Sequence, residues 1–176
     1  MFEITFGELW AVITVLWIAV RAKKALKTGR FSFGEEIKML LVYVCLVVIA
    51  RMVYFPLRHV DGRIGTLKFD RSRPLWINPV PFTFLFERYE GWQINIIGNI
   101  TMFIPVGIVW PICFKELDTF KKTVLAGFLF TLLIELTQLP FFERCSDVDD
   151  IILNTLGVMI GAGILFGIRK TRKNRA

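Results

Sequence analysis

The sequence predicts an all-α integral membrane protein, a bundle of about five transmembrane helices with one long outer loop. The 176 residues are 55% hydrophobic, and the mean hydropathy is +0.56. Long uncharged runs recur along the chain, as expected for helices that cross a bilayer. Lys and Arg gather in short segments between these runs, where such residues set the orientation of membrane helices.

Composition excludes several other classes of protein. The net charge of +7 comes from loops between apolar spans, which favours contact with anionic lipid, and no nucleic-acid partner is predicted. The cysteines Cys45, Cys113 and Cys145 are odd in number and lack metal-ligand spacing, so neither a disulfide framework nor a zinc site is expected. A single membrane domain, residues 1–176, is predicted, and the oligomeric state stays open.

The first two predicted spans cover residues 4–20 and 37–55. The first lacks a basic n-region and a small-residue cleavage site, so we do not expect a cleavable signal peptide. Five basic residues follow it within residues 21–30, which predicts an outer N-terminus and a cytoplasmic first loop. The second span then leads back outward, where Arg51 can extend to the surface.

The loop after the second span is about 35 residues long, which is typical of functional loops. Its residues 60–69 alternate apolar and polar side chains around Asp61-Gly62 and predict a small β-hairpin. Residues 71–82 contain three prolines and two arginines, which disfavours regular helix or central strand. Residues 82–92 are aromatic and amphipathic and are expected to lie in the membrane interface.

The remaining spans are predicted over residues 94–113, 123–140 and 150–168. A basic loop separates the first two and a basic tail follows the last, so the C-terminus of this multi-pass protein is expected in the cytoplasm. Small residues spaced four apart in the last span predict close helix packing. These residues are Gly157, Gly161, Gly163 and Gly167.

Three of the predicted spans carry a polar side chain at one depth. Asn99 and Glu135 lie five residues inside the outer ends of their spans, and Asn154 lies four residues inside its own. At about 1.5 Å per residue, all three lie roughly 6–8 Å below the outer interface. Because a carboxylate within a span is costly, the pattern predicts an outward-facing polar pocket. Its predicted rim contains Gln138, Arg144, Asp147, Asp149 and Asp150.

Motifs in the second half of the chain resemble those of the VanZ-like family of small bacterial membrane proteins. They are Asn78-Pro79-Val80-Pro81-Phe82, Gly98-Asn99, Phe103-Ile104-Pro105-Val106-Gly107, Glu135-x-x-Gln138, Arg144 with Asp147-x-Asp149-Asp150, and Asn154-Thr155-x-Gly157. The resemblance covers residues 78–161. It implies the bacterial cytoplasmic membrane and lower susceptibility to glycopeptide antibiotics, teicoplanin and other lipid-bearing members in particular. Such drugs bind peptidoglycan precursors at the outer face, and their acyl tail enters the membrane.

The pocket is interpreted first as a binding site for a membrane lipid, such as a lipid-linked peptidoglycan precursor, or for a lipoglycopeptide. Arginines would contact phosphate or carboxylate, and the acidic residues would accept hydrogen bonds from hydroxyl or amino groups. The acidic residues could also hold a divalent cation, but no other cofactor is predicted. The candidate binding residues are Arg71, Arg73, Asn78, Asn99, Glu135, Gln138, Arg144, Asp147, Asp149, Asp150 and Asn154.

Two alternatives stay open at this point. In an enzyme acting on an envelope lipid, Glu135 would be the general acid or base while Asp150 stays ionised, although the chain shows no accompanying Ser–His or Cys–His pattern. In a purely structural cluster, Arg144 would neutralise Asp147 or Asp150. There, Glu135 would form hydrogen bonds with Asn99 and Asn154 to fix the bundle.

Overall fold

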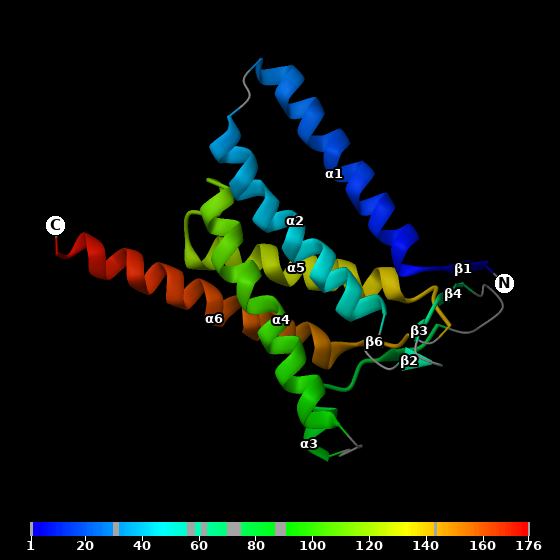
Figure 1. The fold of residues 1–176 in the computed structure, drawn as a ribbon. Helices are drawn as coiled ribbons and strands as arrows, with labels where there is room; N and C mark the ends of the chain where they lie inside the picture. The colour runs from blue at the N-terminus through cyan, green and yellow to red at the C-terminus, as the bar shows by residue number, and fades with distance from the viewer. Residues whose placement is uncertain are drawn as a thin grey trace. The chain divides into compact units, whose positions relative to one another are not determined.

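The computed structural model describes residues 2–29, 32–55, 59–60, 63–69, 75–86, 91–142 and 144–175, with backbone alone at 59–60, 63–64 and 84–85. Its long helices are α1 (Phe6–Thr28), α2 (Phe33–Tyr54), α4 (Trp92–Cys113), α5 (Phe120–Gln138) and α6 (Val148–Lys173) (Figure 1). These correspond to the five predicted spans. Among the described residues, α2, α4 and α6 are long and apolar enough to cross a membrane. The predicted all-α membrane fold is confirmed.

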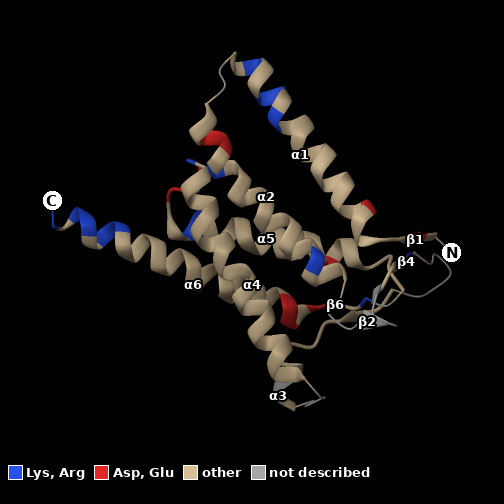
Figure 2. Cartoon of the chain, viewed as in Figure 1, with Lys and Arg blue, Asp and Glu red and all other residues tan. Residues whose placement is uncertain are grey.

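Charged residues concentrate toward the ends of the helices. The Lys and Arg residues of α1 and α6 gather in the later turns of these helices (Figure 2). The first turn of α6 instead holds two carboxylates. In α1 and α6 this arrangement keeps the middle of the helix apolar and places acids and bases where the helix dipole favours them.

The chain divides into two compact units. The first consists of Met1–Arg73 and Pro140–Arg144, and the second of Pro74–Leu139 and Cys145–Ala176. Each unit is built from both an earlier and a later part of the sequence, because the short segment after α5 belongs to the first unit.

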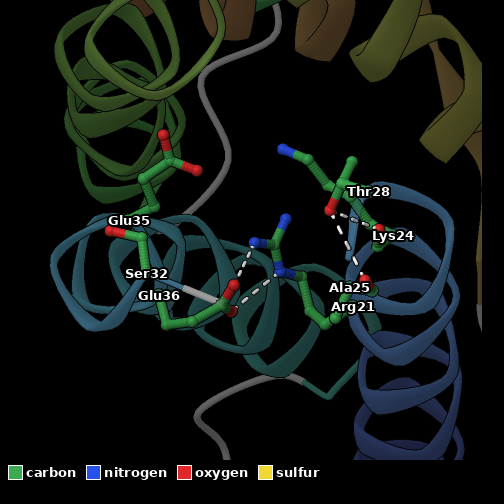
Figure 3. A pocket seen from close by; sticks show the side chains of 7 residues that line it. All are labelled: Arg21, Lys24, Ala25, Thr28, Ser32, Glu35 and Glu36. Carbon is green, nitrogen blue, oxygen red and sulfur yellow. Dashed lines mark hydrogen bonds and ion pairs between the residues drawn. The ribbon is translucent and has the colours of Figure 1, made fainter. Parts of the chain in front are cut away.

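The first unit is built on a helical hairpin of α1 and α2. Thr5 and Glu8 form a capping box at the start of α1, with the Thr5 N–H donating to Glu8 Oε2 at 2.7 Å. Farther along, the Arg21 guanidinium donates two hydrogen bonds to the Glu36 carboxylate, at 2.9 and 2.5 Å. This ion pair lines a cavity of about 350 Å³ between the two helices, into which Lys24 also extends (Figure 3).

Short strands complete the first unit. β2 (His59–Val60) pairs antiparallel with β3 (Arg63–Ile64), so strands flank the predicted turn, whose residues Asp61-Gly62 lie outside the described part of the chain. β1 (Phe2–Ile4) pairs antiparallel with β4 (Leu67–Phe69), which the sequence pattern did not predict. The Phe142 N–H donates to the Lys68 carbonyl at 2.8 Å and attaches the 140–144 segment.

The second unit is organised by close packing of α4 against α6. A Cβ built on Gly157 would overlap the carbonyl oxygen of Ile100, and one on Gly161 would overlap that of Ile104. On the facing helix, a Cβ on Gly107 would overlap the Val158 carbonyl oxygen. Glycines on both helices therefore let the two backbones touch. Residue numbers rise together along the contact, so both helices run in the same direction there.

Helix α5 covers the same part of α6 in the opposite direction. A Cβ on Gly127 would lie 2.6 Å from the Val158 side chain, and Asn154 of α6 donates to Thr131 of α5. The buried face of α5 is mostly polar, since Thr123, Thr131, Glu135 and Gln138 are all at most 5% exposed.

Short elements join the helices at one end: β5 (Ile77–Asn78), β6 (Ser146–Asp147) and α3 (Thr83–Phe86).

The glycine prediction is confirmed for one pair of residues and wrong for the other. Gly157 and Gly161 contact α4 directly, whereas a Cβ on Gly163 or Gly167 would meet no atom within 4 Å. Gly163 and Gly167 lie on a side of α6 that contacts no described part of the chain, so spacing alone could not assign their role.

Substituting Gly161 should separate α4 from α6. We expect Gly161→Ala to lower the free energy of unfolding by about 1–3 kcal/mol, because the added methyl group overlaps the α4 backbone. Gly163→Ala on the same helix is the matched control and should change stability little. Unfolding of the purified protein in mixed detergent micelles measures both values, and equal effects of the two substitutions would contradict this packing.

Candidate functional site

The candidate site lies where α6 begins. Asp147 is the N-cap of α6, and its Oδ1 accepts a hydrogen bond from the Asp149 N–H at 2.8 Å. Asp149 and Asp150 occupy the first turn, where the helix dipole stabilises negative charge. The motif Asp147-x-Asp149-Asp150 thus forms the N-terminal end of α6, where Asp147 caps the helix and the other two carboxylates lie in its first turn.

Asp149 attaches the loop before α3 to α6. Its carboxylate accepts hydrogen bonds from the Phe82 N–H at 2.5 Å, the Thr83 N–H at 2.8 Å and the Thr83 hydroxyl at 2.6 Å. Beside it, Asn78 Nδ2 donates to Asp147 Oδ2 at 3.1 Å, where β5 and β6 pair in parallel. Asn78, Asp147 and Asp149 therefore hold the loop in place.

Asp150 of α6 and Glu135 of α5 connect this group of carboxylates to the other two helices of the unit. Asp150 accepts a hydrogen bond from Asn99 Nδ2 of α4 at 2.5 Å. Glu135 of α5 is only 2% exposed, and its Oε2 accepts from the Asp147 N–H at 3.0 Å. We call Glu135, Asp147, Asp149 and Asp150 the acidic cluster.

Asn154 lies one turn deeper in α6 than Asp150. Its Nδ2 donates to Thr131 Oγ1 at 2.8 Å, and its Oδ1 is buried without a hydrogen-bond partner among the described residues. The purely structural alternative paired Glu135 with Asn99 and Asn154, but the structure gives each of the three another partner. Gln138 is also buried, on the same face of α5 as Glu135.

The acidic cluster lies far from the described cations of its own unit. Glu135 is 13 residues from Lys122 along α5, or about 20 Å. Asp150 is 19 residues from Arg169 along α6, or about 28 Å. Both distances exceed the range of an ion pair. The described cations, all at the opposite helix ends, are Lys115, Lys121, Lys122, Arg169, Lys170, Arg172, Lys173 and Arg175.

Of the three predicted arginines, only Arg144 lies among the described residues. Arg144 belongs to the first unit, where its Nη2 donates to the Tyr54 carbonyl at 2.6 Å. The predicted contact of Arg144 with Asp147 or Asp150 therefore stays a prediction. Arg71 and Arg73 lie outside the described residues.

Two threonines of the site were missed by sequence reasoning. Thr131 precedes Glu135 by one helical turn, so its spacing on α5 already predicted a shared face. Thr83 binds Asp149 from the first residue of α3, and only the tertiary structure shows that pairing.

Within the described residues, no three His, Cys, Asp or Glu side chains form a group that could hold a metal ion. The oxygens of the cluster instead accept hydrogen bonds from the chain.

The loop attachment can be tested at two neighbouring carboxylates. We expect Asp149→Asn to speed hydrogen exchange at the Phe82 and Thr83 amides, because an amide side chain cannot accept all three hydrogen bonds. Asp150→Asn, which leaves these acceptors in place, is the control. Exchange measured by mass spectrometry should separate the two variants, and equal protection in both would contradict the assigned role of Asp149.

Cys145 should react slowly with alkylating reagents. Burial, and then the nearby Asp147 carboxylate, raises the pKa of the Cys145 thiol above its usual value. Less thiolate is then present at neutral pH, and the rate should keep rising with pH beyond the range of an ordinary thiol. In a variant with Cys45 and Cys113 replaced by Ala, iodoacetamide labelling should be about 10-fold slower than after unfolding. Equal rates would argue against this environment.

The chain was also compared with known proteins. The VanZ/LLP1 family model matches residues 40–169, which include every described residue of the acidic cluster and its partners. Protein VanZ of Enterococcus faecium is 27% identical over 146 residues, which are 81% of this chain and 81% of that protein. No solved structure gives a significant match. With a match over most of its length, the chain belongs to the VanZ/LLP1 family.

Proposed function

We propose that this protein lowers the susceptibility of a bacterial cell to glycopeptide antibiotics, especially lipid-bearing ones such as teicoplanin. In this proposal the acidic cluster faces outward and binds the polar head of a lipid-linked envelope component or of the drug itself. The N-terminus lies outside and the C-terminus in the cytoplasm. Membership of the VanZ/LLP1 family and the membrane helices support the coarser, resistance-type function.

One observation carries the proposal: four carboxylates meet at one end of the second unit while its described cations lie at the other. A concentration of negative charge of this kind attracts amino groups, and its oxygens accept hydrogen bonds from hydroxyl groups. The basic helix ends support placing the opposite, acidic end outside the cell.

Glu135 and Asp150 are the proposed recognition residues. Asp147 and Asp149 already accept hydrogen bonds from the loop and from the start of α6. Glu135 and Asp150 each come from a different helix and complete the cluster on the side of the bundle core. Arg144 stays a prediction of the sequence alone, as a contact for phosphate or carboxylate.

Drug susceptibility at matched protein level tests the proposal. In a sensitive Gram-positive host, the wild-type protein should raise resistance to teicoplanin more than to vancomycin. Glu135→Gln and Asp150→Asn keep similar shapes but replace a carboxyl group with an amide, so both should return susceptibility to that of empty vector. Asp118→Asn, an exposed carboxylate that pairs with Lys122 in the loop between α4 and α5, is the matched control and should keep protection.

Two outcomes would contradict the proposal. Absence of protection by the wild-type protein would refute the resistance function for this chain. Full protection by Glu135→Gln and Asp150→Asn would refute the role of the acidic cluster. Immunoblots of the membrane fraction separate loss of activity from loss of protein, because a merely structural role would lower abundance together with protection.

A further inference from the structure

Residues 75–86, which include β5, α3 and the loop between them, contain no charged residue. Apart from the indole of Trp76, their only polar side chains are those of Asn78 and Thr83. Both point inward: Asn78 Nδ2 donates to Asp147 at 3.1 Å, and the Thr83 hydroxyl donates to Asp149 at 2.6 Å. The side-chain amide and hydroxyl groups of this segment therefore face the acidic cluster.

The backbone of residues 79–83 also needs no water to satisfy its N–H groups. Pro79 and Pro81 have no N–H. The Val80 N–H donates to Asn78 Oδ1 at 3.2 Å, while the Phe82 and Thr83 N–H groups donate to Asp149 at 2.5 and 2.8 Å. Every N–H donor of this stretch is thus absent or paired within the chain, as a lipid environment requires.

Apolar side chains point outward from the same segment. Exposure of the described large ones ranges from 46% at Phe82 to 83% at Phe86. The others are Leu75, Trp76, Ile77 and Val80. This arrangement, with polar groups inside and apolar groups outside, is the reverse of a water-facing loop and indicates an apolar surrounding medium.

The loop keeps this shape at a conformational cost. Phe82 has φ 64°, a left-handed conformation that a bulky residue rarely adopts. The N–H groups of Phe82 and Thr83 are both held by the single Asp149 carboxylate, which maintains the conformation. An exposed aromatic ring is thus presented by a constrained backbone.

The next described element, α4, also begins with exposed apolar side chains. Ile94 and Ile97 in the first turns of that helix are 74% and 61% exposed, and α4 is one of the helices apolar enough to cross a membrane. The 75–86 segment is therefore followed in the chain by a helix that is apolar enough to cross a membrane and begins with exposed apolar side chains.

We infer that residues 75–86 insert into the lipid leaflet at the end of the second unit where α6 begins. Phospholipid occupies their outward face, and Asp149 is the positioning residue that holds the loop for insertion. The acidic cluster, directly behind the loop, is consequently held at the depth of the lipid head groups. This inference concerns the position of the loop in the bilayer and stands whether or not the protein affects drug susceptibility.

Nitroxide labels measure this depth directly. Val80→Cys and Phe86→Cys are made separately in a protein whose native cysteines are replaced by Ala, then labelled and reconstituted into phosphatidylethanolamine–phosphatidylglycerol vesicles. Collisions with oxygen, which concentrates in lipid, are compared with collisions with a water-soluble nickel chelate. Both labels should favour oxygen, whereas a label at Asp118→Cys in the exposed α4–α5 loop should favour nickel.

Two results would overturn the inference. Nickel access at Val80 and Phe86 equal to that at Asp118 would place the loop in water. Access to neither reagent would place it in a protein–protein contact.

A second measurement requires no cysteine substitution. Bromine atoms near the head-group end of the acyl chains should quench Trp76 fluorescence, taken as the difference between wild type and Trp76→Phe in such vesicles. An unquenched difference would contradict insertion even if the cysteine variants failed to fold.

Discussion

The hydrogen bonds accepted by the first-turn carboxylates of α6 hold the second unit together at its acidic end. Asp149 receives two backbone N–H groups and a hydroxyl group from the segment that ends in α3, and Asp150 receives Asn99 of α4. The position of the loop and the alignment of α4 with α6 both depend on these contacts. Such an arrangement is strong because charged acceptors form stronger hydrogen bonds than neutral ones, particularly away from water.

Glycine contacts make this polar arrangement geometrically possible. Gly107, Gly157 and Gly161 let the backbones of α4 and α6 touch, so the short side chain of Asn99 can reach Asp150. In lipid, burial of apolar surface gives little net gain, and close van der Waals packing has to supply the attraction between helices. The polar face of α5 then has partners on α6, as Thr131 has in Asn154.

Charge is separated along the second unit rather than paired. The acidic cluster and the described cations occupy opposite helix ends, roughly a bilayer core apart. This separation agrees with the proposed orientation, in which the basic segments face the cytoplasm and the acidic end is the proposed recognition surface. Beside that surface the 75–86 segment faces its apolar side chains outward. A polar head group and its lipid tail could thus be contacted by neighbouring parts of one unit.

The sequence by itself determined the five helices, since apolar runs and basic loops fix them through local physics, and it identified the carboxylates and amides of the site. It could not assign their partners, because spacing along a helix defines a shared face but not the helix that this face meets. The structural alternative paired Asn99 with Glu135, for example, but Asn99 donates to Asp150, and only two of four spaced glycines contact α4. Tertiary structure alone decided that Asp149 holds a loop 66 residues distant, because that contact requires chain segments to meet in space.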